Sequence, residues 1–272
     1  MPAAICTTCG TQYPDAPAPP AGCAVCLDER QYVGAGGQSW TTLDALRARH
    51  RTALERLEPG LYAIGSVPDF GIGQRALLLR RPEGNVLWDC IAPLDGAAID
   101  VLRALGGLSA IAVSHPHFFT TMVEWARAFD CPIVLHADLE RHVRRPDPAV
   151  RFWEGDTHAL APGLTLVRLG GHFRGSTVMH WAGGAGGAGA LCTGDTIQVV
   201  PDTRWVSFMR SYPNLVPLPI EAVDRIVAGV EPFAFERLYS PWPDRHVLSE
   251  AKQVVRRSAE RYRAAIGAAV PA

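Results

Sequence analysis

The sequence of 272 residues has almost no net charge and almost no lysine. It contains 26 basic and 27 acidic residues, which gives a formal net charge of -1, and Lys252 is the only lysine. A protein that neutralises many phosphates needs a basic face, and this balance supplies none. We therefore expect no nucleic-acid partner.

Long apolar segments are also missing. No apolar run approaches the roughly 18 residues that a transmembrane helix needs. The N-terminus, Met-Pro-Ala-Ala-Ile-Cys, lacks the basic start and apolar stretch of a secretory signal. These absences predict a cytoplasmic protein with no membrane partner, in a compartment that keeps thiols reduced. The 48% hydrophobic content is that of a globular protein with a sizeable core.

Four of the seven cysteines are gathered near the N-terminus. Cys6 and Cys9 form one Cys-x-x-Cys turn, and Cys23 and Cys26 form another after thirteen intervening residues. Two such turns can present four thiolates in a tetrahedron, and a segment with so little apolar core needs a metal to fold. We expect a zinc ribbon over residues 1–33, with iron as the alternative metal. A site closed by four cysteines leaves no open position and is structural.

A Gly-Ala-Gly-Gly joint at residues 34–37 precedes a main domain expected over residues 34–272. Helices are predicted at residues 43–57, 95–105, 121–129, 138–145, 220–228 and 248–266. Strands are predicted at residues 75–80, 85–90, 108–114, 132–135, 164–169, 177–181 and 190–193. This mixture indicates an α/β or α+β layered fold. The glycine-rich residues 184–189 lie between two of these strands, so they predict a hairpin loop and no nucleotide site.

Candidate metal ligands recur where predicted strands end. His115 and His117 follow the strand at residues 108–114, His172 follows the strand at 164–169, and Asp195 follows the strand at 190–193. His246 comes just before the last predicted helix. Each residue alone is a weak signal, but together they offer imidazole and carboxylate donors that suit a divalent metal.

With these motifs, residues 61–246 resemble the metallo-β-lactamase fold of metal-dependent hydrolases. The resemblance rests on His115-x-His117, the Gly-Gly-His172-x-x-Gly-Ser turn, Thr-Gly-Asp195 and the distal His246. It implies an α+β fold in which two mixed sheets are flanked by helices in αββα order. It also implies that His115, His117 and His172 form the first metal site. Asp195 would then be the bridging carboxylate, and His246 a ligand of the second site.

The chain departs from the family motif His-x-His-x-Asp-His at its end. Phe119 stands in place of the aspartate and Thr120 in place of the histidine. Phenylalanine cannot bind a metal, and a threonine hydroxyl is a poor substitute for imidazole. His136 is a further candidate ligand, although a structural role is expected for it. The sequence therefore predicts one ion, Zn²⁺ or Fe²⁺, in the main domain, held by three histidines and Asp195.

The family resemblance implies a hydrolase that acts on an ester, thioester, lactone or phosphoester with a metal-activated water. Asp195 would complete the metal shell or serve as the general base. Arg174, Arg210 and Tyr212 lie in segments expected near the metal, where guanidinium groups can grip an anionic small-molecule substrate. Two alternatives stay open: a mononuclear iron oxygenase of the same fold, and a non-catalytic binding or scaffold protein. The sequence predicts no oligomeric state.

Overall fold

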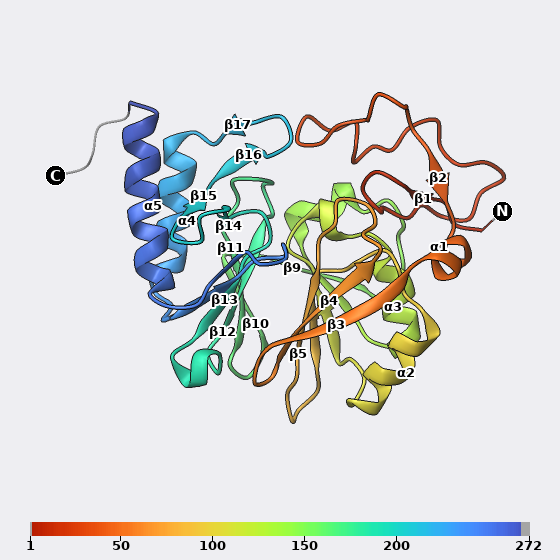
Figure 1. Cartoon of the computed structure of the whole chain (residues 1–272), viewed down its shortest axis with the longest axis horizontal. Helices are drawn as coiled ribbons and strands as arrows, with labels where there is room; N and C mark the ends of the chain where they lie inside the picture. The colour runs from red at the N-terminus through yellow and green to blue at the C-terminus, as the bar shows by residue number, and fades with distance from the viewer. Residues whose placement is uncertain (1, 268–272) are drawn as a thin grey trace. The chain divides into compact units, whose positions relative to one another are not determined.

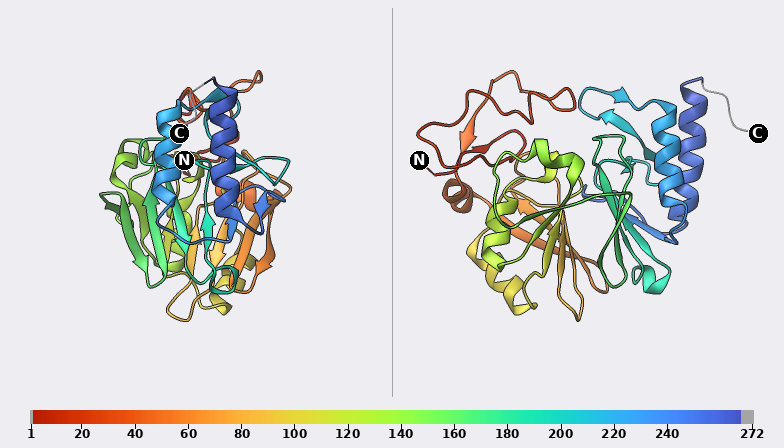
Figure 2. Two further views of the ribbon diagram at one scale, coloured as in Figure 1. Left: turned by 90° about the vertical axis from the view of Figure 1, so that its left-hand side faces the viewer. Right: turned by 180° about the vertical axis from the view of Figure 1, so that it is seen from behind.

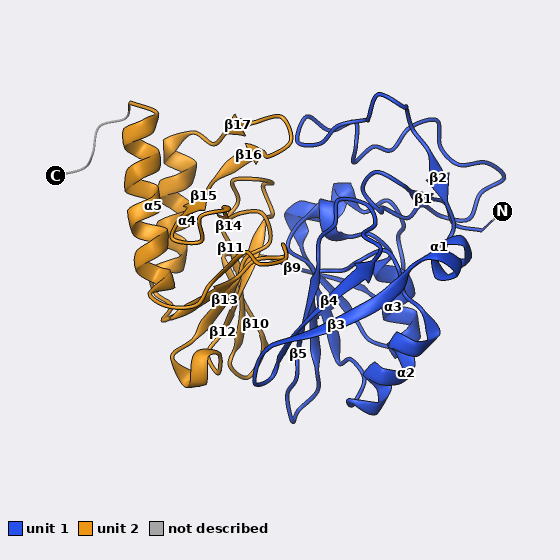
Figure 3. Ribbon diagram, in the orientation of Figure 1, with its two compact units in different colours: residues 1–153 blue, residues 154–272 orange. Residues whose placement is uncertain are grey.

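The computed structural model describes residues 2–267 of the chain. The chain divides into two compact units, Met1–Trp153 and Glu154–Ala272, which Figure 3 colours separately. Each unit combines one large β-sheet with helices, as the sequence predicts for a layered α+β fold.

The first unit begins with the cysteine-rich segment. Strand β1 (Ile5–Cys6) pairs antiparallel with β2 (Trp40–Thr41), so the segment closes on itself after about 35 residues. Helix α1 (Leu43–Arg49) follows, and Thr42 caps it by accepting a hydrogen bond from the amide of Ala45. The domain boundary predicted at residue 33 stays a prediction. Strand pairing within the cysteine-rich segment extends to Thr41.

A seven-stranded sheet forms the body of the first unit, in the order β3-β4-β5-β6-β7-β8-β9. The strands from β3 to β6 pair antiparallel, and those from β6 to β9 pair parallel. The strand bounds are Arg51–Glu58, Leu61–Val67, Ala76–Leu79, Val86–Trp88, Ala110–Ala112, Ile133–His136 and Val150–Trp153.

The predicted helix over residues 43–57 is wrong in its second half. Helix α1 ends at Arg49, and residues 51–58 form the edge strand β3. His50 has extended backbone angles, and β3 pairs along nearly its whole length with β4. The apolar spacing of Leu54 and Leu57 fits a helix, but the backbone hydrogen bonds of a sheet edge decide the outcome.

Helices connect the parallel strands of this sheet. Helix α2 (Gly96–Ala104) begins after Asp95, whose carboxylate accepts from the amide of Ala98. Helix α3 (Met122–Phe129) buries Met122, Val123, Trp125 and Ala126. The predicted helix at residues 138–145 is instead a 3₁₀ helix, η2 (Ala137–His142), and a second 3₁₀ helix, η1, spans Pro116–Phe118.

The second unit contains a six-stranded sheet in the order β10-β11-β12-β13-β18-β19. The strand bounds are Thr157–Ala161, Leu164–Arg168, Thr177–Trp181, Ala190–Cys192, Arg237–Tyr239 and His246–Val247. Two small antiparallel ribbons accompany it: β14 (Gln198–Val199) with β15 (Val206–Ser207), and β16 (Met209–Ser211) with β17 (Val216–Pro217). The glycine-rich residues 184–189 lie in the connection between β12 and β13, as predicted, and include a 3₁₀ turn, η3 (Ala185–Gly187).

Helices α4 (Ile220–Val230) and α5 (Ala251–Ala265) lie side by side in this unit (Figures 1 and 2). Their apolar faces pack with buried residues of the six-stranded sheet in a single core, which includes Val178, Leu191, Val223, Leu238 and Val255. Burial of this surface is the main force that joins helices and sheet. Across residues 2–267, no helix combines the length and the apolar character of a membrane span.

Candidate metal centres

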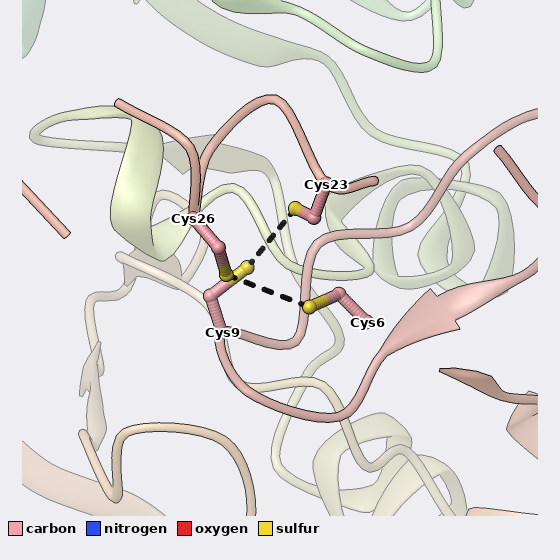
Figure 4. A group of neighbouring side chains, drawn as sticks. All are labelled: Cys6, Cys9, Cys23 and Cys26. Atoms are coloured by element: carbon pink, nitrogen blue, oxygen red, sulfur yellow. Dashed lines mark hydrogen bonds between the residues drawn. The ribbon is translucent and has the colours of Figure 1, made fainter. Parts of the chain in front are cut away.

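The four N-terminal cysteines form one buried cluster (Figure 4). The Sγ atoms of Cys6 and Cys26 lie 3.6 Å apart, as do those of Cys9 and Cys23. A tetrahedral ion with metal–sulfur bonds of about 2.3 Å places its sulfur ligands about 3.8 Å apart. The quartet therefore fits one tetrahedral metal ion, and the predicted four-cysteine site is confirmed as a metal-binding group.

Polar groups around the quartet favour thiolates. The Gln38 amide donates to Cys6 Sγ at 3.2 Å, and the Tyr13 hydroxyl donates to Cys23 Sγ at 3.5 Å. Hydrogen bonding with Cys26 lowers the pKa of Cys23 to about 7, whereas hydrogen bonding with Cys23 raises the pKa of Cys9 and of Cys26 above the usual value. Because the thiolate is the ligand that metals bind, these contacts prepare the site for an ion.

A second set of donors lies at the end of β7 in the first unit. His115 and His117 are both buried, and their ring centroids are 5.0 Å apart. Ser114 Oγ lies 2.8 Å from His115 Nδ1. A hydrogen bond to one ring nitrogen fixes the orientation of a histidine, and Nε2 is the ligand atom in the tautomer whose Nδ1 donates to Ser114 Oγ.

Asp89 supports this turn from the neighbouring strand, and sequence reasoning missed it. It follows β6, it is fully buried with φ of 62°, and its Oδ1 accepts from the amide of Ser114 at 2.7 Å. The signal in the sequence was a carboxylate directly after the apolar run Val-Leu-Trp, where a parallel strand ends. Asp89 thus fixes the backbone of Ser114, whose hydroxyl group contacts His115.

His172 and Asp195 come together in the second unit, at the ends of β11 and β13. His172 Nε2 lies 4.0 Å from Asp195 Oδ2, and both side chains are almost fully buried. The other ring nitrogen, Nδ1, lies 3.2 Å from the carbonyl oxygen of Met209 in β16. This contact makes Nδ1 the donor and leaves Nε2 as the metal-binding atom, the arrangement typical of metal-bound histidine.

Tyr212 reaches the same turn from the connection between β16 and β17. Its hydroxyl lies 3.1 Å from the backbone carbonyl oxygens of both Asp195 and Ser207. Burial raises the pKa of Tyr212 well above its usual value, so the hydroxyl keeps its proton and donates it. The structure shows this contact of Tyr212 with the backbone of Asp195. The substrate-binding role expected for Tyr212 stays a prediction.

The remaining candidates lie in different surroundings. Arg174 is exposed, and Arg210 is half-buried in β16. His246 is half-buried in β19, with its ring 5.2 Å from that of Tyr239. His136 Nδ1 accepts from the amide of Asp138, and its ring packs on Trp153 at 4.6 Å, in agreement with a structural role.

Comparison with known proteins gives one relative by sequence and several by structure. No family model matches the chain. The chain is 48% identical over 264 residues to the uncharacterized protein YmaE of Bacillus subtilis (strain 168), and the alignment covers 96% of each protein.

Solved structures of metallo-β-lactamases are similar to the chain at low sequence identity. A B3 metallo-β-lactamase with an active-site glutamic acid has a TM-score of 0.56 and 16% identity, over 82% of this chain and 92% of that one. FIM-1 from Pseudomonas aeruginosa, in its mono-zinc form, has a TM-score of 0.58 and 14% identity, over 78% of this chain and 96% of that one. These similarities confirm the predicted metallo-β-lactamase fold.

Proposed function

Because the chain belongs to the same family as YmaE and has the metallo-β-lactamase fold, we propose that it is a metal-dependent hydrolase. The observation that carries the proposal is the preparation of buried imidazoles as metal ligands. His172 Nδ1 faces a carbonyl oxygen, which can only accept, so Nε2 is the unprotonated nitrogen of the neutral ring and suits a ligand role. His115 has the same arrangement in the tautomer whose Nδ1 donates to Ser114 Oγ.

We propose that His115, His117, His172 and Asp195 hold one ion together. Three imidazoles and one carboxylate form a donor set that suits zinc and iron(II). Phe119 and Thr120 contribute no strong donor toward a second ion, so a single ion is proposed. His246 is then a distal ligand, a proton shuttle or a substrate contact.

When bound, the ion acts as a Lewis acid and lowers the pKa of a water molecule to about 7. Asp195 accepts the proton of the attacking water, since its carboxylate lies beside His172 and its backbone is held by Tyr212. The water oxygen would bond to the carbonyl carbon or phosphorus of an ester, thioester, lactone or phosphoester, and the bond from that atom to the leaving oxygen or sulfur would break. The leaving oxygen or sulfur would take up the proton that was removed from the water; in a lactone this group stays attached as the alcohol of the opened ring.

The proposed substrate is a small molecule with a negative charge near the scissile bond. Arg174 and Arg210 flank the segments that carry His172 and its Met209 partner, in the loop after β11 and in β16. A guanidinium group binds carboxylate or phosphate through two parallel hydrogen bonds. The proposed compartment is the cytoplasm, because reduced thiols are required for the four-cysteine site.

The test is turnover of chromogenic substrates by purified protein after metal removal and readdition. The panel contains nitrophenyl esters, a thioester, a lactone, bis-nitrophenyl phosphate and a chromogenic β-lactam. We expect at least one to be hydrolysed only with metal, and we expect His117→Ala and His172→Ala to abolish the reaction. His158→Ala, a half-buried histidine in β10, is the matched control and should keep full activity.

Two other results of these experiments would support the alternative functions, an iron oxygenase or a non-catalytic protein. Iron in the protein as isolated, with oxygen consumption in place of hydrolysis, indicates the mononuclear oxygenase. Failure of the main domain to retain any metal overturns the hydrolase and favours a binding or scaffold protein.

A further inference from the structure

The first cysteine turn contacts the loop that carries His115 and His117, within the first unit. The backbone amide of Gln12 donates to the carbonyl oxygen of Thr120 at 3.1 Å. Gly10 has φ of +80°, and a Cβ at this position would lie 3.1 Å from Ala92 Cβ and 3.3 Å from Thr120 Cγ2. The Thr120 methyl group therefore faces Gly10, and only glycine allows this close approach.

Thr120 needs such support because of its backbone conformation. Its φ is +37°, a left-handed value that is unfavourable for a β-branched residue. Strained conformations persist only where the surrounding structure holds them in place. Here the amide of Gln12 holds the carbonyl group of Thr120, only three residues after His117.

Side chains extend the contact to helix α3. The Gln12 amide nitrogen donates to Glu124 Oε1 at 3.1 Å, and Arg145 donates to both Gln12 Oε1 and Glu124 Oε1. Gln12 and Arg145 are buried. A Cβ at Gly71 would lie 3.4 Å from the backbone carbon of Cys9, so the β4–β5 loop also packs on this turn. The turn is thus fixed between two loops of the main sheet.

We propose that residues 9–12, here called the knuckle, are the positioning element of the loop at residues 115–120. This inference rests on the proposed metal site, in which His115 and His117 are ligands. Phe119 and Thr120 stand at the end of this loop, where the family motif has ligands of a second ion. Without these ligands, contacts with the knuckle keep the end of the loop in place, and the cysteine-bound ion supports the knuckle. Gln12 is a positioning residue.

The first test compares Gly10→Ala with Gly37→Ala. Both glycines have positive φ, 80° and 77°, so both variants carry the same kind of backbone penalty. A Cβ at Gly37 meets nothing within 4 Å, whereas one at Gly10 pushes the knuckle away from Thr120. Hydrogen exchange of the amides in residues 115–121 should be about tenfold faster in Gly10→Ala and unchanged in Gly37→Ala.

Cobalt(II) provides a second readout, because the two centres differ in their spectra. With cobalt in both sites, the near-ultraviolet cobalt–thiolate absorption reports the ribbon. With zinc first bound to the ribbon and cobalt added afterwards, the visible bands report the histidine site. We expect Gly10→Ala to change the visible bands and to weaken cobalt binding at the histidine site about tenfold. Gly37→Ala should stay within about twofold of the wild type.

The substitution Thr120→Gly provides the coupling test. Glycine adopts positive φ without strain and lacks the methyl group, so it removes the contact at 3.3 Å and leaves the one with Ala92 Cβ at 3.1 Å. In this background Gly10→Ala should therefore weaken cobalt binding clearly less than the tenfold expected in the wild-type chain. A full tenfold effect of Gly10→Ala in the Thr120→Gly protein overturns the proposal.

Unchanged exchange and unchanged cobalt affinity in Gly10→Ala, with the thiolate absorption intact, also overturn it. Should Gly10→Ala lose the thiolate absorption, Gln12→Ala takes its place, because it lies outside the quartet and removes the contacts with Glu124 and Arg145. Unchanged exchange in Gln12→Ala then overturns the proposal. If the wild type binds cobalt only at the ribbon, the proposed function fails, while the exchange experiment still decides the role of the knuckle.

Discussion

The Tyr212 hydroxyl lies 3.1 Å from the backbone carbonyl oxygen of Asp195, and it lies at the same distance from that of Ser207. His172 is connected to the same segment, because its Nδ1 lies 3.2 Å from the carbonyl oxygen of Met209. The β16 strand and the residues that follow it therefore hold His172 and Asp195, two of the metal-ligand candidates of the second unit. Tyr212 acts on the backbone of Asp195 and leaves its carboxylate to other partners.

Tyr212→Phe removes this hydroxyl and keeps the ring. We expect a loss of about 1 kcal/mol in the free energy of unfolding, since the carbonyl groups lose a donor in a buried place. Metal affinity at the histidine site should fall, with KM for substrate unchanged. Tyr262→Phe is the control, because its hydroxyl donates to the carbonyl oxygen of Leu218 at 2.7 Å, far along the chain from the ligands. A raised KM with unchanged metal affinity would instead support direct substrate binding by Tyr212.

Replacement of Cys6 and Cys9 by serine should remove one equivalent of metal per chain. The hydroxyl groups cannot replace thiolates, and the ribbon unfolds without its ion because its core consists largely of the cysteines themselves. Metal content by mass spectrometry measures the loss. Cys131→Ser, at a buried and isolated cysteine, is the control and should keep all bound metal. Unaltered metal content in the double variant contradicts the four-cysteine site.

The wild-type chain should bind two metal ions in total, one in the ribbon and one at the histidine site. Phe119 stands where a second-site carboxylate is needed, and a pair of divalent ions about 3.5–4 Å apart repel each other without it. Anomalous scattering from crystals locates each ion. Two fully occupied ions side by side near Asp195 would show that another residue, such as His136, replaces the missing ligands.

Arg174→Ala and Arg210→Ala should each raise KM for an anionic substrate about tenfold, because each removes a charged hydrogen-bond donor. A neutral substrate of the same shape should be affected far less. Arg225→Ala, at an exposed position of α4, controls for the loss of one positive charge. Equal kinetics for both substrates in all three variants would remove the anionic group from the proposal.

His142 should make the protein less stable in mild acid. Its burial lowers the pKa from 6.5 to about 4 in the folded chain. Between these pH values the unfolded chain binds a proton that the folded chain does not bind, so stability falls as the pH decreases from about 6.5 towards 4. Because the ring is half exposed, we expect His142→Gln to relieve only about 1 kcal/mol at pH 5.

Denaturant titration at pH 5 and pH 8 measures this effect as a difference between variant and wild type, so that acid effects on the cysteine site cancel. At pH 8 neither state of His142 is protonated, and the variant should gain nothing. A difference between the two proteins that is equal at both pH values would contradict the prediction.

Signals that lie close together in the sequence determined much of this molecule. The two Cys-x-x-Cys turns specify a metal ribbon because each turn by itself brings two thiols to one side, and the structure closes the quartet. Helices α2, α3, α4 and α5 follow from apolar periodicity, and α2 also has a side-chain cap at Asp95. His115 and His117 could be recognised because they directly follow a buried strand, where polar side chains are otherwise unexpected.

Tertiary structure alone decided the features that depend on distant partners. Residues 51–58 have a helical apolar pattern, but backbone pairing with β4 makes them a strand. The support of Ser114 by Asp89 spans 25 residues, and the contact of Gln12 with Thr120 spans more than a hundred. In both the donor is a backbone amide, which every residue but proline possesses, so the sequence does not mark which amide takes part. Only the folded chain selects which amide meets which acceptor.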